Sequence, residues 1–126
     1  MEYKVVMPYI GGVLSENAYK YLTKRTKPFV RLWMCELAEK AEQLNIPESK
    51  GYTIELYGKF WDLNGTPDLS NLHKVIGDAL KKTKQWNGLG IDDKNFLFVD
   101  KGYELGKFDP ELEITIKSLA EKVKND

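Results

Sequence analysis

The chain has 126 residues, of which 42% are apolar and 30% are charged, and its formal net charge at neutral pH is zero. This length fits one domain, residues 1–126, which can bury roughly 65% of its unfolded surface. The composition excludes a disordered chain, no apolar run approaches the ~20 residues that span a bilayer, and the zero charge argues against indiscriminate coating of nucleic acid. We expect a soluble protein with no membrane partner. Since the N-terminus shows no secretory signal, we expect it to be cytoplasmic.

The first half of the chain contains one predicted strand and one long predicted helix. Residues 3–9 are typical of a strand, which the double glycine at 11–12 ends. Residues 15–25 fit either a short helix or a mobile loop. From Pro28 the apolar spacing predicts a helix, and Asn45-Ile46-Pro47 ends it because proline cannot continue a helix. Its apolar face comprises Val30, Trp33, Met34, Leu37, Ala41 and Leu44.

The second half predicts three strands and a second helix. Residues 52–60 alternate between apolar and polar side chains, as a half-buried strand does. A helix is expected from about Ser70 to Lys82, and strands are expected at 95–103 and 111–117. Residues 118–126 fit a short helix or a frayed tail. The order β, α, β, α, β, β predicts an α+β domain, with a small mixed or antiparallel sheet and two main helices packed on it.

Two basic clusters stand out in a chain of zero net charge. The first lies between residues 20 and 31 and contains no acidic residue, so it is the predicted DNA-binding segment. The second lies at 81–84 and fits equally well the last turn of a helix, where lysine suits the helix dipole. The first cluster consists of Lys20, Lys24, Arg25, Lys27 and Arg31.

The chain has one cysteine, Cys35, and one histidine, His73. These numbers exclude an internal disulfide, a CxxC metal knuckle and a histidine-rich zinc site. Any metal must therefore be held mainly by oxygen ligands, which favours Mg²⁺ or Mn²⁺.

A polar face on the second helix is the candidate site. On a helix, Asn71, Lys74 and Asp78 fall within about 60° of one another, opposite an apolar arc. Asp68 precedes the helix, and the pair Asp92–Asp93 comes just before the next strand. Each feature also has a structural explanation: a helix cap, an ordinary i, i+4 surface pair and a turn. Together they indicate an acidic site that contains a lysine.

The pattern P-D-x-x-N-x-x-K-x-x-x-D-A-L begins at Pro67 and is followed by D-D at Asp92–Asp93. It resembles the signature of the RusA-type Holliday-junction resolvases, which are dimeric α+β nucleases often carried by prophages. The order of strands and helices is similar across most of the chain. The resemblance implies a homodimeric, Mg²⁺-dependent endodeoxyribonuclease, with Mn²⁺ as an alternative ion. Its substrate would be the four-way DNA junction, resolved by paired symmetric hydrolysis in recombination and repair.

The resemblance also implies roles for individual residues. Lys74 is the catalytic lysine, and Asp68 and Asp93 are catalytic carboxylates. The expected metal ligands are Asp68, Asp92, Asp93 and Asp78, with Ser70 and Asn71 as auxiliary residues.

One departure from the family concerns Ser70, because many members have a second aspartate at that position. Three explanations stay open: Ser70 holds a metal-bound water, Asp78 substitutes for the carboxylate, or activity is weak. The alternative functions are therefore a catalytically weak or silent protein that binds branched DNA, and a nuclease for other branched DNA. A structural domain without DNA binding would make the signature a coincidence.

Two further residues invite a functional interpretation. Helical geometry places His73 off the polar face, so we predict a surface or flanking residue rather than a ligand. Trp86 offers a ring on which a base can stack, but a loop tryptophan that covers the core is the favoured interpretation.

Overall fold

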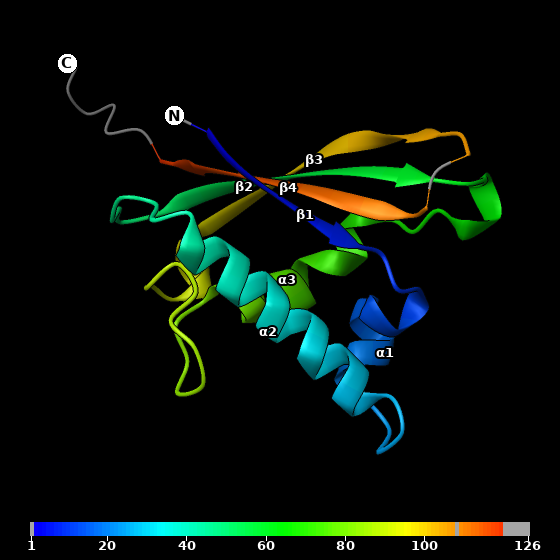
Figure 1. Ribbon diagram of the computed structural model, residues 1–126, viewed down its shortest axis with the longest axis horizontal. Coiled ribbons are helices and arrows are strands. Elements are labelled where there is room, and N and C mark those ends of the chain that lie inside the picture. Colours follow the sequence, from blue (N-terminus) through cyan, green and yellow to red (C-terminus); the bar gives the residue numbers. More distant parts are fainter. Residues whose placement is uncertain (1, 108, 120–126) are drawn as a thin grey trace.

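Four strands form one mixed sheet in the computed structural model, which describes residues 2–107 and 109–119 (Figure 1). The strands are β1 (Glu2–Pro8), β2 (Tyr52–Phe60), β3 (Phe96–Leu105) and β4 (Glu111–Ser118). Their order is β1-β4-β2-β3; β4 is antiparallel to both β1 and β2, and β3 is parallel to β2. The predicted α+β class is confirmed, and the parallel pair makes the sheet mixed.

The strands follow from the alternation of side chains along the sequence. In β2, Ile54, Leu56 and Phe60 are fully buried on the helical side of the sheet, while the residues of the opposite face, Glu55, Tyr57 and Lys59, are only half-buried. The bounds of β2 match the prediction, and the other strands differ from theirs by one or two residues at the ends. Most of the segment 118–126, predicted as a short helix or a tail, lies outside the described residues.

The α-helices of the described chain are α1 (Glu16–Lys20), α2 (Lys27–Gln43) and α3 (His73–Leu80). Figure 1 shows α2 and α3 under the same face of the sheet. The helix α1 settles the alternatives for 15–25 in favour of a short helix. The helix predicted from Ser70 to Lys82 is instead a 3₁₀ turn at Leu69–Leu72 followed by α3, which ends where Lys81 becomes extended. None of these helices has both the length and the apolar character that a membrane crossing requires.

The long helix α2 packs its predicted apolar face against the sheet and also protects the outer edge of β1. The Nε1 of Trp33 donates a hydrogen bond to the carbonyl oxygen of Pro8 at 2.7 Å, and the Nζ of Lys40 donates one to that of Val6 at 3.0 Å. Unpaired carbonyl groups on an edge strand can pair with a strand of another chain. These two hydrogen bonds occupy two such carbonyls of β1 and so make that pairing less favourable. The buried residues of α2 are Val30, Trp33, Met34, Leu37, Ala38 and Ala41.

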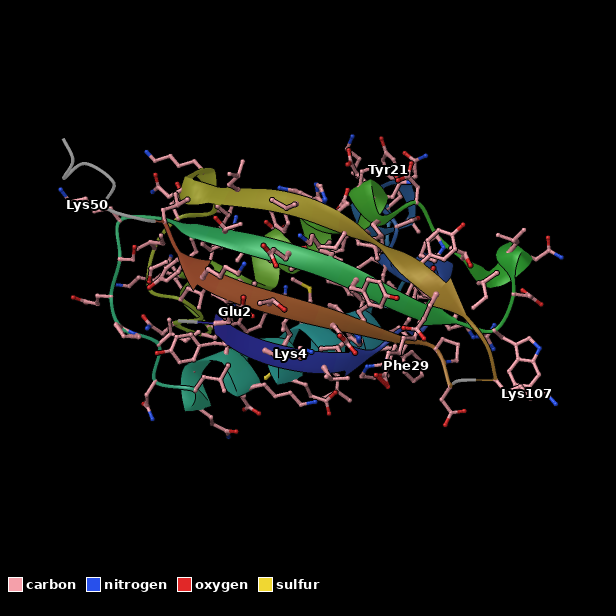
Figure 2. All side chains as sticks on the ribbon, turned by 90° about the horizontal axis from the view of Figure 1, so that it is seen from above. Glu2, Lys4, Tyr21, Phe29, Lys50 and Lys107 are labelled. Carbon is pink, nitrogen blue, oxygen red and sulfur yellow. The ribbon has the colours of Figure 1, made fainter. Side chains whose placement is uncertain are left out.

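No helix of the described residues covers the other face of the sheet, which is turned toward the viewer in Figure 2. Charged side chains on this face form ion pairs. The carboxylate of Glu113 on β4 forms ion pairs with Lys4 and Lys59, and each lysine Nζ lies 3.2 Å from a carboxylate oxygen. Lys117 pairs with Glu2 at 3.3 Å and with Glu55 at 2.9 Å. Because these charges satisfy one another, the motif residues on the helical side are the better candidates for a functional site.

The loop after α3 is held against α2, and this places Asp92–Asp93 next to α3. One carboxylate oxygen of Glu42 accepts hydrogen bonds from the backbone N–H of Asn87 at 3.0 Å and of Gly88 at 2.9 Å. Gly88 has a φ of +53°, and a Cβ there would overlap the carbonyl of Leu80. Only glycine fits this turn, since it tolerates positive φ and brings no side chain.

We therefore expect Gly88→Ala to lower the free energy of unfolding by about 2–4 kcal/mol, because the added methyl group overlaps backbone and strains φ. Urea denaturation measures the change. The matched control is Gly12→Ala, since Gly12 has an ordinary φ and no atom within 4 Å of its Cβ position. Equal denaturation midpoints for the two variants would contradict the described turn.

Candidate functional site

The carboxylate of Asp68 caps the 3₁₀ turn that leads into α3. Its Oδ1 accepts hydrogen bonds from the backbone N–H of Ser70 at 3.1 Å and from the Ser70 hydroxyl at 2.9 Å. The structural explanation of Asp68 as a cap is therefore correct. The second carboxylate oxygen of Asp68, Oδ2, accepts none of the hydrogen bonds found among the described residues. The serine that departs from the family pattern is the direct partner of the first motif aspartate.

Asp78 joins two lysines and a tyrosine at the other end of α3. Its Oδ1 pairs with Lys74 at 3.4 Å and with Lys81 at 3.1 Å, and its Oδ2 accepts a hydrogen bond from the hydroxyl of Tyr19 at 2.7 Å. Burial and this hydrogen bond raise the pKa of Tyr19, so the hydroxyl stays a donor. The Lys74–Asp78 pair follows the predicted helical face, whereas nothing in the sequence near Asp78 indicated Tyr19.

Asp93 lies against α3 at a glycine. A Cβ on Gly77 would lie 3.6 Å from the Oδ2 of Asp93, which is ordinary van der Waals contact, so the carboxylate packs on the helix at this residue. Burial, followed by a hydrogen bond with the side chain of Asp92, raises the pKa of Asp93. The same hydrogen bond lowers the pKa of Asp92. Lys81 and Asp78 act on Asp93 through their charges, so Asp78, Asp92 and Asp93 form one acidic cluster with Lys81.

The structure gathers the predicted residues into two groups along α3. Asp68 and Ser70 lie just before its first residue, and the acidic cluster lies at its second half, to which Lys74 reaches from the first turn. No hydrogen bond or ion pair found among the described residues joins Asp68 to Asp92 or Asp93. In the same part of the chain, no three His, Cys, Asp or Glu side chains are close enough together to hold a metal ion.

His73 makes a tertiary contact that the prediction of a surface or flanking residue understated. Its Nε2 lies 2.8 Å from the Oδ1 of Asp100, and its ring stacks on Phe98 with centroids 4.4 Å apart. The side chain is half-buried between α3 and β3. Asp100 is 27 residues further along the chain, so no local pattern could reveal this partner.

The basic segment runs from the end of α1 to the first turns of α2. Lys20, Lys24, Arg25, Lys27 and Arg31 are all exposed. The guanidinium of Arg31 lies 5.8 Å from the ring centre of Trp86, within the range of a cation–π contact. Trp86 packs on the core, as predicted. Since Tyr19 belongs to α1, its bond to Asp78 ties the basic segment to the acidic cluster.

Tyr19→Phe tests this tie. The variant should lose about 1 kcal/mol of stability, because a half-buried carboxylate loses a donor. It should also bind DNA a few-fold more weakly, because α1 is released from α3. Chemical denaturation and a gel shift measure the two effects. Tyr21→Phe is the matched control, since Tyr21 is 78% exposed. If Tyr19→Phe and Tyr21→Phe have the same stability and the same DNA affinity, the Tyr19–Asp78 hydrogen bond does not connect the basic segment to the acidic cluster.

Fold and site together define a small α+β protein that holds carboxylates and lysines along one helix, next to a basic segment. A scan against protein-family models finds no model that matches the chain, and a search of curated proteins finds no matching relative.

Proposed function

We propose that this protein is a metal-dependent endodeoxyribonuclease that acts on branched DNA and, as a homodimer, resolves four-way junctions. The observation that carries the proposal is the acidic cluster on α3, which contains two paired lysines and is tied by Tyr19 to an exposed basic segment. Cleavage of a phosphodiester needs a group that activates water and a positive charge that stabilises the phosphate. Carboxylates that can bind a metal ion would serve the first need, and the lysines would serve the second.

The carboxylate oxygens of Asp92 and Asp93 are of the kind that Mg²⁺ and Mn²⁺ prefer, although no third acidic side chain joins them closely among the described residues. Burial and the neighbouring carboxyl of Asp92 raise the pKa of Asp93, and the negative charges of Asp78 and Asp92 add to the rise through repulsion. A hard cation relieves this repulsion and prefers carboxylate oxygens. The Oδ2 of Asp68, which accepts none of the hydrogen bonds found among the described residues, is an oxygen donor in the separate group at the start of α3. When bound, the ion supplies the charge that polarises a phosphate oxygen and acidifies water.

Lys74 is the group that we assign to the phosphate. Its side chain is 52% exposed, so the ammonium can reach a substrate while Asp78 holds it from one side. An ammonium in this position stabilises the charge that grows on the phosphate oxygens in the transition state. Because both oxygens of Asp78 are engaged by Tyr19, Lys74 and Lys81, we assign Asp78 to holding the lysines and prefer Asp92 and Asp93 as metal ligands.

The homodimer would supply two equivalent sites for symmetric cuts. An exposed apolar surface at the start of α2 is available for such a contact. Phe29 is 66% exposed and Leu32 is 60% exposed, and both line a groove of about 390 Å³ that also includes Ile10. Exposed apolar patches of this kind mark interaction sites.

The second candidate function is a catalytically weak or silent protein that binds branched DNA, and Ser70 favours it. The hydroxyl of Ser70 bonds to Asp68 where many family members carry a carboxylate. If this serine limits catalysis, Ser70→Asp should raise the cleavage rate at least several-fold. An unchanged or lower rate would show that the serine belongs to a working site.

A gel shift in EDTA tests DNA binding apart from chemistry. Wild-type protein is titrated against a four-way junction, a three-way flap and a linear duplex of the same length, at low salt. We expect the junction to bind at least 10-fold more tightly than the duplex. Equal binding to the flap and the junction would favour a nuclease for other branched DNA. An absence of binding to all three would contradict the proposed function.

A further inference from the structure

A cleft of about 620 Å³ opens beside Asp68, and it is not part of the acidic cluster. One wall is the loop that follows β1, with Gly11 and Gly12, and the other is the segment from Asn64 to Asn71. The volume lies within the ~300–1,000 Å³ of pockets that hold small organic molecules. Because Asp68 and Asn71 line the cleft, a molecule bound there lies next to the start of α3.

Three polar side chains of this cleft are neutral and available. The side chains of Ser15, Asn64 and Asn71 line it and take no part in the hydrogen bonds found among the described residues. Asp68 is the one charged residue among those that form its lining. An anion would be repelled by that carboxylate, whereas a neutral group with amide-like edges would find donors and acceptors.

The remaining walls are apolar or bare. Tyr9 is fixed by an edge-to-face contact with Phe60 at 5.4 Å between ring centroids, and Ile10 and Pro67 add apolar surface. No atom lies within 4 Å of the Cβ positions of Gly11 and Gly12, so that wall leaves room for a flat ring. An aromatic ring with apolar walls and free amides is the chemistry that binds a nucleobase and its sugar.

We propose that the cleft receives one unpaired deoxynucleoside of the strand that is cut. This assignment rests on the proposed function, because it takes DNA as the substrate. A base at a branch point has fewer stacking and pairing contacts to lose, so its extrusion costs less than within a duplex. The cleft therefore selects branched DNA by accepting a base that a duplex holds inside.

The test uses a single strand of five nucleotides whose linkages are neutral methylphosphonates. Such a probe cannot bind the basic segment through phosphate charge, so binding reports on bases and sugars. In amide NMR spectra, wild-type protein should show shifts concentrated at Gly11, Gly12, Gly65 and Asn71. Gly12→Trp, which fills the cleft, should weaken binding at least 10-fold, and Asn64→Ala should weaken it about 3-fold.

Two matched controls separate the cleft from general damage. Gly12→Ala leaves the cleft open, and Asn17→Ala removes an exposed amide outside it, so both should bind the probe as wild type does. Shifts elsewhere, an absence of binding, or equal binding by Gly12→Trp would overturn the proposal. Junction cleavage by the same wild-type preparation is scored separately. Cleavage without probe binding contradicts only the proposal that the cleft binds a nucleoside. Probe binding without cleavage contradicts only the proposed nuclease function.

Discussion

Asp93→Asn should abolish cleavage and at the same time make the protein more stable. Removing the carboxylate of this proposed metal ligand should lower the cleavage rate by at least about 100-fold. Asp93 also has a raised pKa in the folded protein, caused first by burial and then by Asp92. The folded state therefore binds more protons than the unfolded state between the two pKa values, and stability falls as pH rises through that window. Asparagine removes this cost at neutral pH.

The measurements are the single-turnover cleavage rate and the melting temperature between pH 4 and pH 8. The stability gain of Asp93→Asn over wild type should grow with pH and then level off above the raised pKa. Mg²⁺ at ten times its Kd should stabilise wild type by about 1.4 kcal/mol and so raise its melting temperature. The melting temperature of the variant should not change. Asp109→Asn, an exposed aspartate, is the control. A variant that still cleaves, or that is less stable at pH 8, contradicts the assignment of Asp93.

Replacing Lys20, Lys24 and Lys27 by glutamine should weaken junction binding about 100-fold at 0.1 M salt. Each phosphate that a lysine neutralises contributes about 0.9 to the slope of log affinity against log salt, so the slope should fall by about 2.7. Arg31 is kept because its contact with Trp86 combines packing with charge. Circular dichroism confirms that the exposed substitutions leave the fold intact.

The matched control replaces three other exposed lysines, Lys50, Lys101 and Lys107. Lys50 and Lys107 lie toward opposite ends of the sheet (Figure 2). This control removes the same charge from the whole protein but none from the basic segment. If the two triple variants lose equal affinity, binding depends on net charge alone and the segment is not the DNA-binding surface.

Local sequence patterns predict the strands and helices of this fold well. Burial of one face makes apolar residues recur at the spacing of a strand or of a helix. The alternation in β2 and the apolar face of α2 gave bounds close to those observed. Two features escaped prediction, and the first of them depends on distant parts of the chain. The parallel pairing of β2 with β3 is set by how the chain returns after α3. The 3₁₀ turn before α3 reflects the cap made by Asp68.

The site shows the same division between local and distant information. The helical spacing that brings Lys74 to Asp78 is local, and it was predicted. Tyr19 meets Asp78 across 59 residues, and no pattern near either residue signals the contact. Asp93 lies against Gly77 of α3, and the loop that precedes Asp93 is held by Glu42. Glycines inside a predicted helix are a usable signal, since such a residue often marks a close approach.

Cleavage of an end-labelled four-way junction by wild type and by Asp68→Asn tests the central claim most directly. The variant keeps an oxygen that can cap the turn at Ser70 but loses the negative charge. With Mg²⁺ or Mn²⁺, wild type should make paired symmetric nicks and spare a linear duplex, and EDTA should stop the reaction. Asp68→Asn should bind the junction equally well and leave it uncut. Binding without cleavage by wild type in either metal, or cleavage by the variant at the wild-type rate, would contradict the account.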